Sequence, residues 1–250
     1  MICPKCRYSQ DDGLAECLKC GVIFAKLHAS AAPAEKVSRP PQAGADALSP
    51  GYAWRELFLP EPRHANPVLI CGRLLLWLVL LLWSAKFIFA SVASNTTGQS
   101  VLHLVNLPFH EAGHIIFSPL GQMLHVMGGT FGQLLMPAVC AAVLLLQTRD
   151  SFGAAAALWW LAENLMDIAP YINDARALEL MLLGGVTGKD VPDYHDWQFI
   201  LGRLGLLRWD HALAGIAQCT GIVLMLAALG WAAASLWLQV KAWCSDASAV

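Results

Sequence analysis

Residues 106–119 read Asn-Leu-Pro-Phe-His-Glu-Ala-Gly-His-Ile-Ile-Phe-Ser-Pro, a histidine-bearing stretch within an apolar segment. Residues four apart share one face of a helix, so His110 and His114 point the same way. Two neutral imidazoles at this spacing can hold one Zn²⁺ at about 2.0–2.1 Å each, and Glu111 could act as general base on a water at that metal. The alternative is a pair of surface histidines beside a solvated glutamate, and the apolar neighbours disfavour it.

The composition places this stretch in a membrane protein. The chain of 250 residues is 57% hydrophobic and only 14% charged, with a mean hydropathy of +0.52. Soluble domains carry about 25% charged residues, so a membrane domain with a polar appendage is favoured. The net charge of −2 gives no reason to expect a nucleic-acid partner.

Long apolar runs predict an all-α polytopic membrane protein with about four to six transmembrane segments, because about 20 apolar residues in a helix cross the bilayer. Between the second and third run, Gly121, Gly128, Gly129 and Gly132 predict non-helical backbone, either a re-entrant hairpin or a surface loop. The apolar runs are 71–93, 101–118, 133–147, 152–172 and 210–240.

Four cysteines near the start form a second metal-binding pattern. Two CxxC pairs are separated by ten residues, and paired knuckles of this kind complete a tetrahedral zinc site. A module this short cannot bury enough apolar surface to fold alone, so the metal would supply the folding free energy. A disulfide pair or a redox CxxC is the alternative; the doubled spacing disfavours both. The predicted ligands of this zinc-ribbon-like module are Cys3, Cys6, Cys17 and Cys20.

The expected organisation is a zinc ribbon over 1–27, a flexible linker and juxtamembrane segment over 28–66, and a transmembrane domain over 67–245. Arg63 and Arg73 precede the first span, and residues 94–100 after it carry no charge. The positive-inside rule therefore predicts a cytosolic N-terminus, in agreement with the lack of a secretory signal at the start. We expect a multi-pass protein of the cytoplasmic (inner) membrane, in contact with the lipid bilayer.

The fourth apolar run carries acids. Carboxylates within a span cost several kcal/mol if they face lipid, so they indicate a site or a polar pair. The alternative is that these acids have no role in a site and only form ion pairs with Lys86 or Arg176. His103 is seven residues before His110 and would support or pack beside it. His195-Asp196 could also contribute to a metal, although a histidine in a polar loop is more commonly a surface residue. The run and its end contain Glu163, Asn164, Asp167, Pro170 and Asp174.

Together, the HEAGH helix and the later Asn164…Pro170…Asp174 resemble a site-2 protease, an intramembrane zinc metalloprotease. The resemblance covers roughly residues 101–180. It implies that His110 and His114 are ligands of a catalytic zinc, that Glu111 is the base and that Asp174 is the third ligand. The family's Asp-Gly pair is Asp174-Ala175 here, and Asp167 is a rival third ligand.

The same resemblance implies hydrolysis of peptide bonds in or near transmembrane segments of a membrane-protein substrate, with one catalytic and one structural Zn²⁺. Asn164, Glu163 and His103 are expected to support the ligands. The glycine-rich stretch 121–132 could pair with an extended substrate by strand addition. Two other functions stay open: a catalytically silent scaffold whose zinc ribbon binds a cytosolic protein partner, and a transporter or metal-handling membrane protein.

Overall fold

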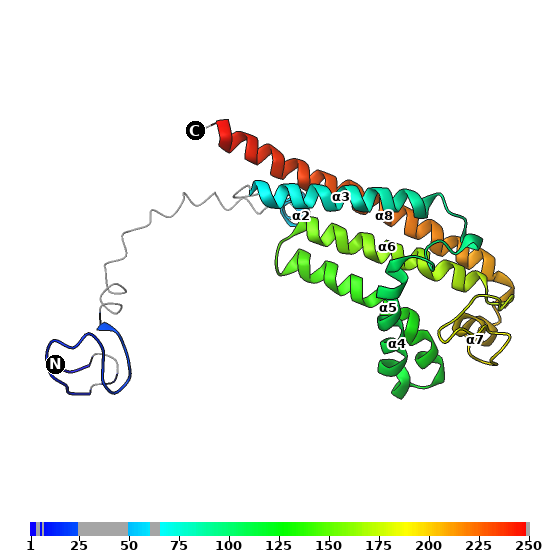
Figure 1. The fold of residues 1–250 in the computed structure, drawn as a ribbon, viewed down its shortest axis with the longest axis horizontal. Helices are drawn as coiled ribbons and strands as arrows, with labels where there is room; N and C mark the ends of the chain where they lie inside the picture. The colour runs from blue at the N-terminus through cyan, green and yellow to red at the C-terminus, as the bar shows by residue number, and fades with distance from the viewer. Residues whose placement is uncertain (4–5, 7, 25–49, 61–65, 249–250) are drawn as a thin grey trace. The chain divides into compact units, whose positions relative to one another are not determined.

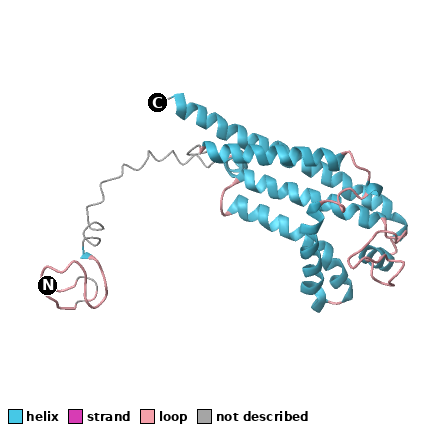
Figure 2. Ribbon diagram, viewed as in Figure 1, coloured by secondary structure: helices cyan, strands magenta, loops and turns pink. Residues whose placement is uncertain are grey.

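The computed structural model describes residues 1–3, 6, 8–24, 50–60 and 66–248, and these are mostly helical (Figures 1 and 2). The chain divides into two compact units, residues 1–49 and 50–250. No strand occurs in the described ranges; the first unit has two isolated antiparallel bridges, Ile2 with Ser9 and Glu16 with Ile23. Most of the predicted linker, at 28–49 and 61–65, lies outside the described residues.

The described helices match the expected mostly helical class. Their starts follow local rules: Oδ1 of Asn66 accepts from the N–H of Val68 at 3.0 Å, and Asp150 accepts from Gly153 at 3.0 Å. The helices are α2 (Pro50–Phe58), α3 (Pro67–Ile88), α4 (Val101–Phe117), α5 (Gln122–Leu146), α6 (Ser151–Asn173), α7 (Asp196–Arg203) and α8 (Asp210–Ser248), with short 3₁₀ turns at Val92–Ser94, Ser118–Leu120 and Leu207–Trp209.

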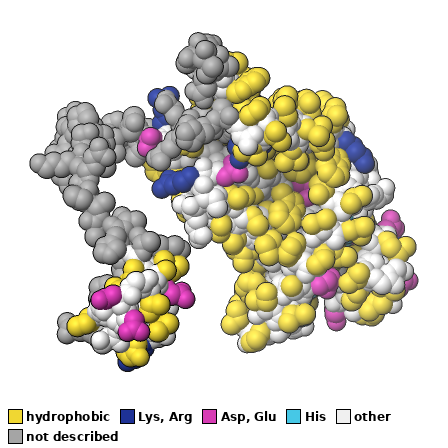
Figure 3. Space-filling model, turned by 60° about the vertical axis from the view of Figure 1, so that its left-hand side comes forward, with side chains coloured by type: hydrophobic (Ala, Val, Ile, Leu, Met, Phe, Trp, Pro, Cys, Tyr) yellow, Lys and Arg dark blue, Asp and Glu magenta, His cyan; other side chains and the backbone are white. Residues whose placement is uncertain are grey.

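Three stretches of helix in the described residues are long and apolar enough to cross a membrane: Pro67–Ile88, Gln122–Leu146 and Leu207–Ser245. Only 17–28% of their most apolar windows is buried within the protein, so most of these side chains face outward. Figure 3 shows hydrophobic side chains spread over the helical unit. The chain thus has the features of a membrane protein, although three candidate spans are fewer than the four to six expected.

Helix α6 forms the centre of the helical unit. It packs most extensively on α8 and also against α5, with α3 beside α8 (Figure 1). Two indole N–H groups form hydrogen bonds between helices. Trp159 of α6 donates to Oγ of Ser84 in α3 at 2.7 Å, and Trp77 of α3 donates to the carbonyl of Leu229 in α8 at 3.0 Å. Around these contacts lies a buried core of Leu80, Phe87, Trp159, Ala162, Met166, Met225, Ala228 and Leu229.

The glycine-rich stretch is helical, contrary to the expected hairpin or loop. From Gln122 on it forms the first turns of α5, and three of its glycines, Gly128, Gly129 and Gly132, lie against residues of α4 such as Gly113. Small residues let two helix backbones approach closely, and that packing offsets the low helix propensity of glycine. Because this backbone is already hydrogen-bonded as a helix, it cannot pair with an extended substrate in the way expected.

The juxtamembrane segment contributes helix α2, which packs on the helical unit at its last residue. The indole N–H of Trp231 donates to the carbonyl of Phe58 at 2.7 Å, and the two rings meet edge to face at 5.4 Å. Trp54 stays 60% exposed. The segment therefore anchors on α8 through Phe58.

Candidate metal centre

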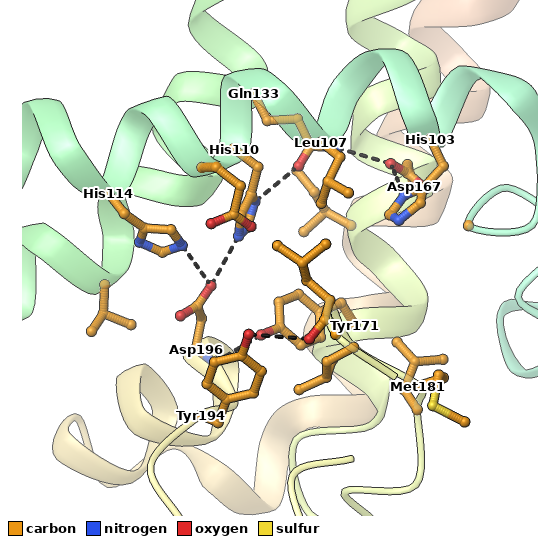
Figure 4. A pocket seen from close by; sticks show the side chains of 18 of the residues that line it. His103, Leu107, His110, His114, Gln133, Asp167, Tyr171, Met181, Tyr194 and Asp196 are labelled. Atoms are coloured by element: carbon orange, nitrogen blue, oxygen red, sulfur yellow. Dashed lines mark hydrogen bonds and ion pairs between the residues drawn. The ribbon is translucent and has the colours of Figure 1, made fainter. Parts of the chain in front are cut away.

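A cavity of about 620 Å³ lies between α4, α5, α6 and the loop that leads into α7 (Figure 4). One wall carries the two histidines and the glutamate of the HEAGH stretch of α4, and the other wall carries residues 180–184, Asp193, Tyr194 and Asp196. Polar side chains lie among apolar ones such as Leu107 and Ile168, as in small-molecule and peptide sites. Its polar lining includes His103, His110, Glu111, His114, His125, Gln133, Asp167, Tyr171, Tyr194 and Asp196.

The two histidines of the HEAGH stretch meet one carboxylate in this cavity. Oδ2 of Asp196 lies 3.0 Å from Nε2 of His110 and 3.3 Å from Nε2 of His114. All three side chains are 12–16% exposed. The three form a group that could hold a metal ion, with the ligand atoms within 4.8 Å of one another.

Neighbouring groups fix which nitrogen of each histidine faces the carboxylate. Nδ1 of His110 donates to Oε1 of Gln133 at 3.2 Å, and Nδ1 of His114 donates to the carbonyl of His125 at 2.9 Å. In the neutral rings both Nε2 lone pairs then point at an anionic oxygen of Asp196. Two lone pairs and an anionic oxygen repel one another at this distance. The arrangement therefore needs a positive charge between them, either from added protons or from a metal ion.

The spacing suits a metal ion. Ligands about 2.0–2.1 Å from zinc at tetrahedral angles lie about 3.3–3.4 Å apart, close to the 3.0 Å and 3.3 Å that separate Oδ2 of Asp196 from the two histidine nitrogens. Gly129 of α5 is buried against the two histidines, and a Cβ there would lie 2.5 Å from Nε2 of both His110 and His114. The bare glycine therefore keeps clear the space in front of both ligand nitrogens.

Asp174, the expected third ligand, lies elsewhere. It ends α6, and its two oxygens accept the N–H groups of Glu179 at 3.0 Å and Leu180 at 2.9 Å. Its other neighbour is Nε2 of His195 at 3.4 Å. Asp174 thus holds the loop in a fold that brings the later Asp196 to the histidines, and Asp196 takes the position that the sequence assigned to Asp174.

Asp167, the alternative third ligand, belongs to a buried network next to the centre. It faces Nδ1 of His103 at 3.0 Å and accepts from the amides of Gln133 at 2.9 Å and Asn106 at 3.1 Å. Asn106 also donates to Glu163 at 2.9 Å. Gln133 joins this network to His110. Asp167, His103 and Glu163 are therefore connected to the candidate ligand His110 through Gln133, and not by direct hydrogen bonds.

Asn164 is placed apart from the cavity. It is fully buried, and its amide donates to the carbonyl of Trp160 at 2.9 Å on its own helix. The alternative pairing of the acids with Arg176 is not what the structure shows, because Arg176 pairs with Asp210 at 2.7 Å. The buried acids of α6 instead bond to the polar side chains of α4 and α5 described above.

Helix α7 begins at Asp196, and its start is fixed by neighbours. His195 caps it, with Nδ1 accepting the N–H of Gln198 at 3.1 Å, and burial lowers the pKa of His195. The N–H of Asp196 donates to the hydroxyl of Tyr171 at 2.9 Å. Burial raises the pKa of Asp196, but the imidazoles of His110 and His114 that face it outweigh this and hold the pKa below its ordinary value.

Sequence reasoning gave Asp196 only a minor role and did not identify Gln133 or Tyr171. A carboxylate directly after a capping histidine at a helix start was the available signal for Asp196. Neither Gln133 nor Tyr171 belongs to a short motif, and their roles follow from helix packing alone.

The second candidate metal site is in the first unit. Sγ of Cys3 lies 3.8 Å from Sγ of Cys20, and Sγ of Cys6 lies 3.7 Å from Sγ of Cys17. Sulfurs about 2.3 Å from a tetrahedral zinc would be about 3.8 Å apart. The cysteines are not in disulfides, and the four sulfurs form a cluster that could bind a metal ion.

No family model, curated protein or solved structure matches this chain. These comparisons therefore give no information about the function of the protein.

Proposed function

We propose that the protein is an intramembrane zinc metalloendopeptidase that hydrolyses peptide bonds in or near transmembrane segments of other proteins. The observation that supports this most directly is the convergence of His110, His114 and Asp196 on one point of a cavity that Glu111 also lines. Two imidazoles and one carboxylate leave a position open, as catalytic zinc sites do. A zinc ion bound there supplies Lewis-acid chemistry, acidifying a water and polarising a carbonyl.

The protein's own groups have distinct tasks in this proposal. Among the described residues, no hydrogen bond or ion pair engages the carboxylate of Glu111, so it is free to take a proton from water and return it to the leaving amine. Gln133 holds the proton of His110 on Nδ1, which keeps Nε2 available as a ligand. The apolar side chains of the cavity, such as Leu107 and Leu180, would contact an unwound apolar segment of substrate.

The cysteine cluster has four thiolates and no open position, which favours a structural zinc. We propose that this module docks a partner or stabilises its own fold, on the cytosolic side of the membrane.

Zinc stoichiometry in the purified full chain tests the proposal. We expect two zinc ions in the wild type, one in Asp196→Ala, and two in Glu56→Gln, which serves as the control because Glu56 is an exposed acid on α2 that does not line the cavity. A second zinc retained in Asp196→Ala would refute the proposed centre.

Turnover is tested separately with fluorescein-labelled casein in detergent, an unfolded substrate. Glu111→Gln should keep both zinc ions and lower cleavage by about 10²–10⁴-fold, the usual contribution of a general base. A wild type that holds two zinc ions and cleaves no faster than Glu111→Gln would count against a peptidase.

A further inference from the structure

Two tyrosine hydroxyls line the cavity, and they differ in what they contact. The hydroxyl of Tyr194 donates to the carbonyl of Leu183 at 3.1 Å, so its proton is already engaged. The hydroxyl of Tyr171 accepts the N–H of Asp196 at 2.9 Å. In the described part of the chain, no acceptor takes the proton of Tyr171. A phenol that accepts one hydrogen bond can still donate another.

The ring of Tyr171 is held in place on two sides. Its centroid lies 4.3 Å from that of His195 and 6.3 Å from that of His110. Its helix is fixed too, because Asp167, one turn earlier, bonds to Gln133 of α5. Figure 4 shows the Tyr171 side chain among the residues that line the cavity, close to Asp196. The hydroxyl is therefore preorganised next to a ligand of the candidate centre.

We infer that the Tyr171 hydroxyl donates a hydrogen bond to the oxygen that a substrate presents at the His110–His114–Asp196 centre, which is the carbonyl oxygen of the scissile peptide. The inference rests on the proposed function and assigns the donor that stabilises negative charge on that oxygen. Donors fixed before the reaction lower its barrier because they need no reorganisation. Glu111 cannot serve in this role, because an ionised carboxylate only accepts hydrogen bonds.

Acetohydroxamate binding to the zinc-loaded full chain in detergent, followed by calorimetry, tests this inference without any substrate. This small anion binds zinc through oxygens, and the closed cysteine site has no position for it. Tyr171→Phe should raise the Kd for acetohydroxamate about tenfold, as expected for one lost hydrogen bond to a charged acceptor. Tyr194→Phe is the matched control and should leave the Kd within about twofold of wild type.

Zinc content and chelator competition in the same samples separate a donor from a merely structural role. Tyr171→Phe should keep both zinc ions. An unchanged acetohydroxamate Kd in Tyr171→Phe, or an equal loss in Tyr194→Phe, would overturn the inference. Loss of zinc from Tyr171→Phe would also overturn it, by showing that the hydroxyl only holds Asp196. A wild type without the second zinc would refute the proposed function itself, a result distinct from these.

Discussion

Gly113 of α4 and Gly128 of α5 touch backbone to backbone: a Cβ on Gly128 would lie 2.5 Å from the carbonyl oxygen of Gly113. The adjacent Gly129 instead faces the imidazoles of His110 and His114. Two neighbouring glycines thus serve different purposes. One permits the helix crossing, and the other leaves room for the candidate metal.

Gly128→Ala should destabilise the helical unit. The added methyl meets a backbone carbonyl, which cannot move aside without separating α4 from α5, and overpacking of this kind costs about 1–3 kcal/mol. Unfolding of the purified protein in mixed detergent micelles measures the change. Gly230→Ala is the control, since a Cβ at Gly230 has no atom within 4 Å. Equal stability of the two variants would contradict the close crossing.

Gly129→Ala should impair metal binding more than folding. Its methyl meets the ends of two histidine side chains, which can rotate away at modest cost but then no longer point at Asp196. We expect the zinc affinity of the centre to fall at least about tenfold, in line with the effect of disturbing ligand orientation. Chelator competition measures it. Wild-type affinity in Gly129→Ala would show that the space in front of the histidines is unimportant.

Cys17→Ser should remove one zinc and unfold the first unit only. The buried thiol of Cys17 is one of four sulfurs in the cluster, and a small metal-stabilised module loses its fold with its metal. Amide exchange of residues 8–24 should become fast, while exchange in α6 stays slow. A protected first unit in the metal-free variant would contradict a structural role for the ion.

The loop between α6 and α7 should loosen in acid. The N–H and hydroxyl of Thr187 lower the pKa of Asp190, and Lys189 lowers the pKa of Glu179. Because these pKa values are lower in the folded protein, the stabilisation is present above the ordinary carboxyl range and is lost as pH falls below about 4. Hydrogen exchange of the Thr187 amide, corrected for intrinsic rates, measures this.

Asp190→Asn provides the control for the acid prediction. Without the titrating carboxylate, protection of the Thr187 amide should be weaker near neutral pH and should change little toward acid. A pH profile identical to that of the wild type would mean that another group governs the loop.

Local sequence determined both sets of candidate ligands that lie close together in the chain. A four-residue spacing in a helix places His110 and His114 on one face, and the two CxxC pairs of the first unit close on each other over a short loop. The apolar runs likewise predicted helices and a membrane environment, because both follow from length and hydropathy.

Only the tertiary structure decided which carboxylate meets the histidines. Asp174 and Asp196 are both acids near a helix end. Asp174 accepts hydrogen bonds from the backbone of the loop between α6 and α7, whereas Asp196, at the end of that loop, faces His110 and His114. The prediction of non-helical backbone for the glycine-rich stretch was also wrong. Glycine has a low helix propensity, and only the contact with α4 stabilises a helix there. Contacts between segments far apart in sequence leave no local pattern, so the candidate third ligand Asp196, Gln133 and Tyr171 are found only once α4, α5, α6 and α7 are packed together.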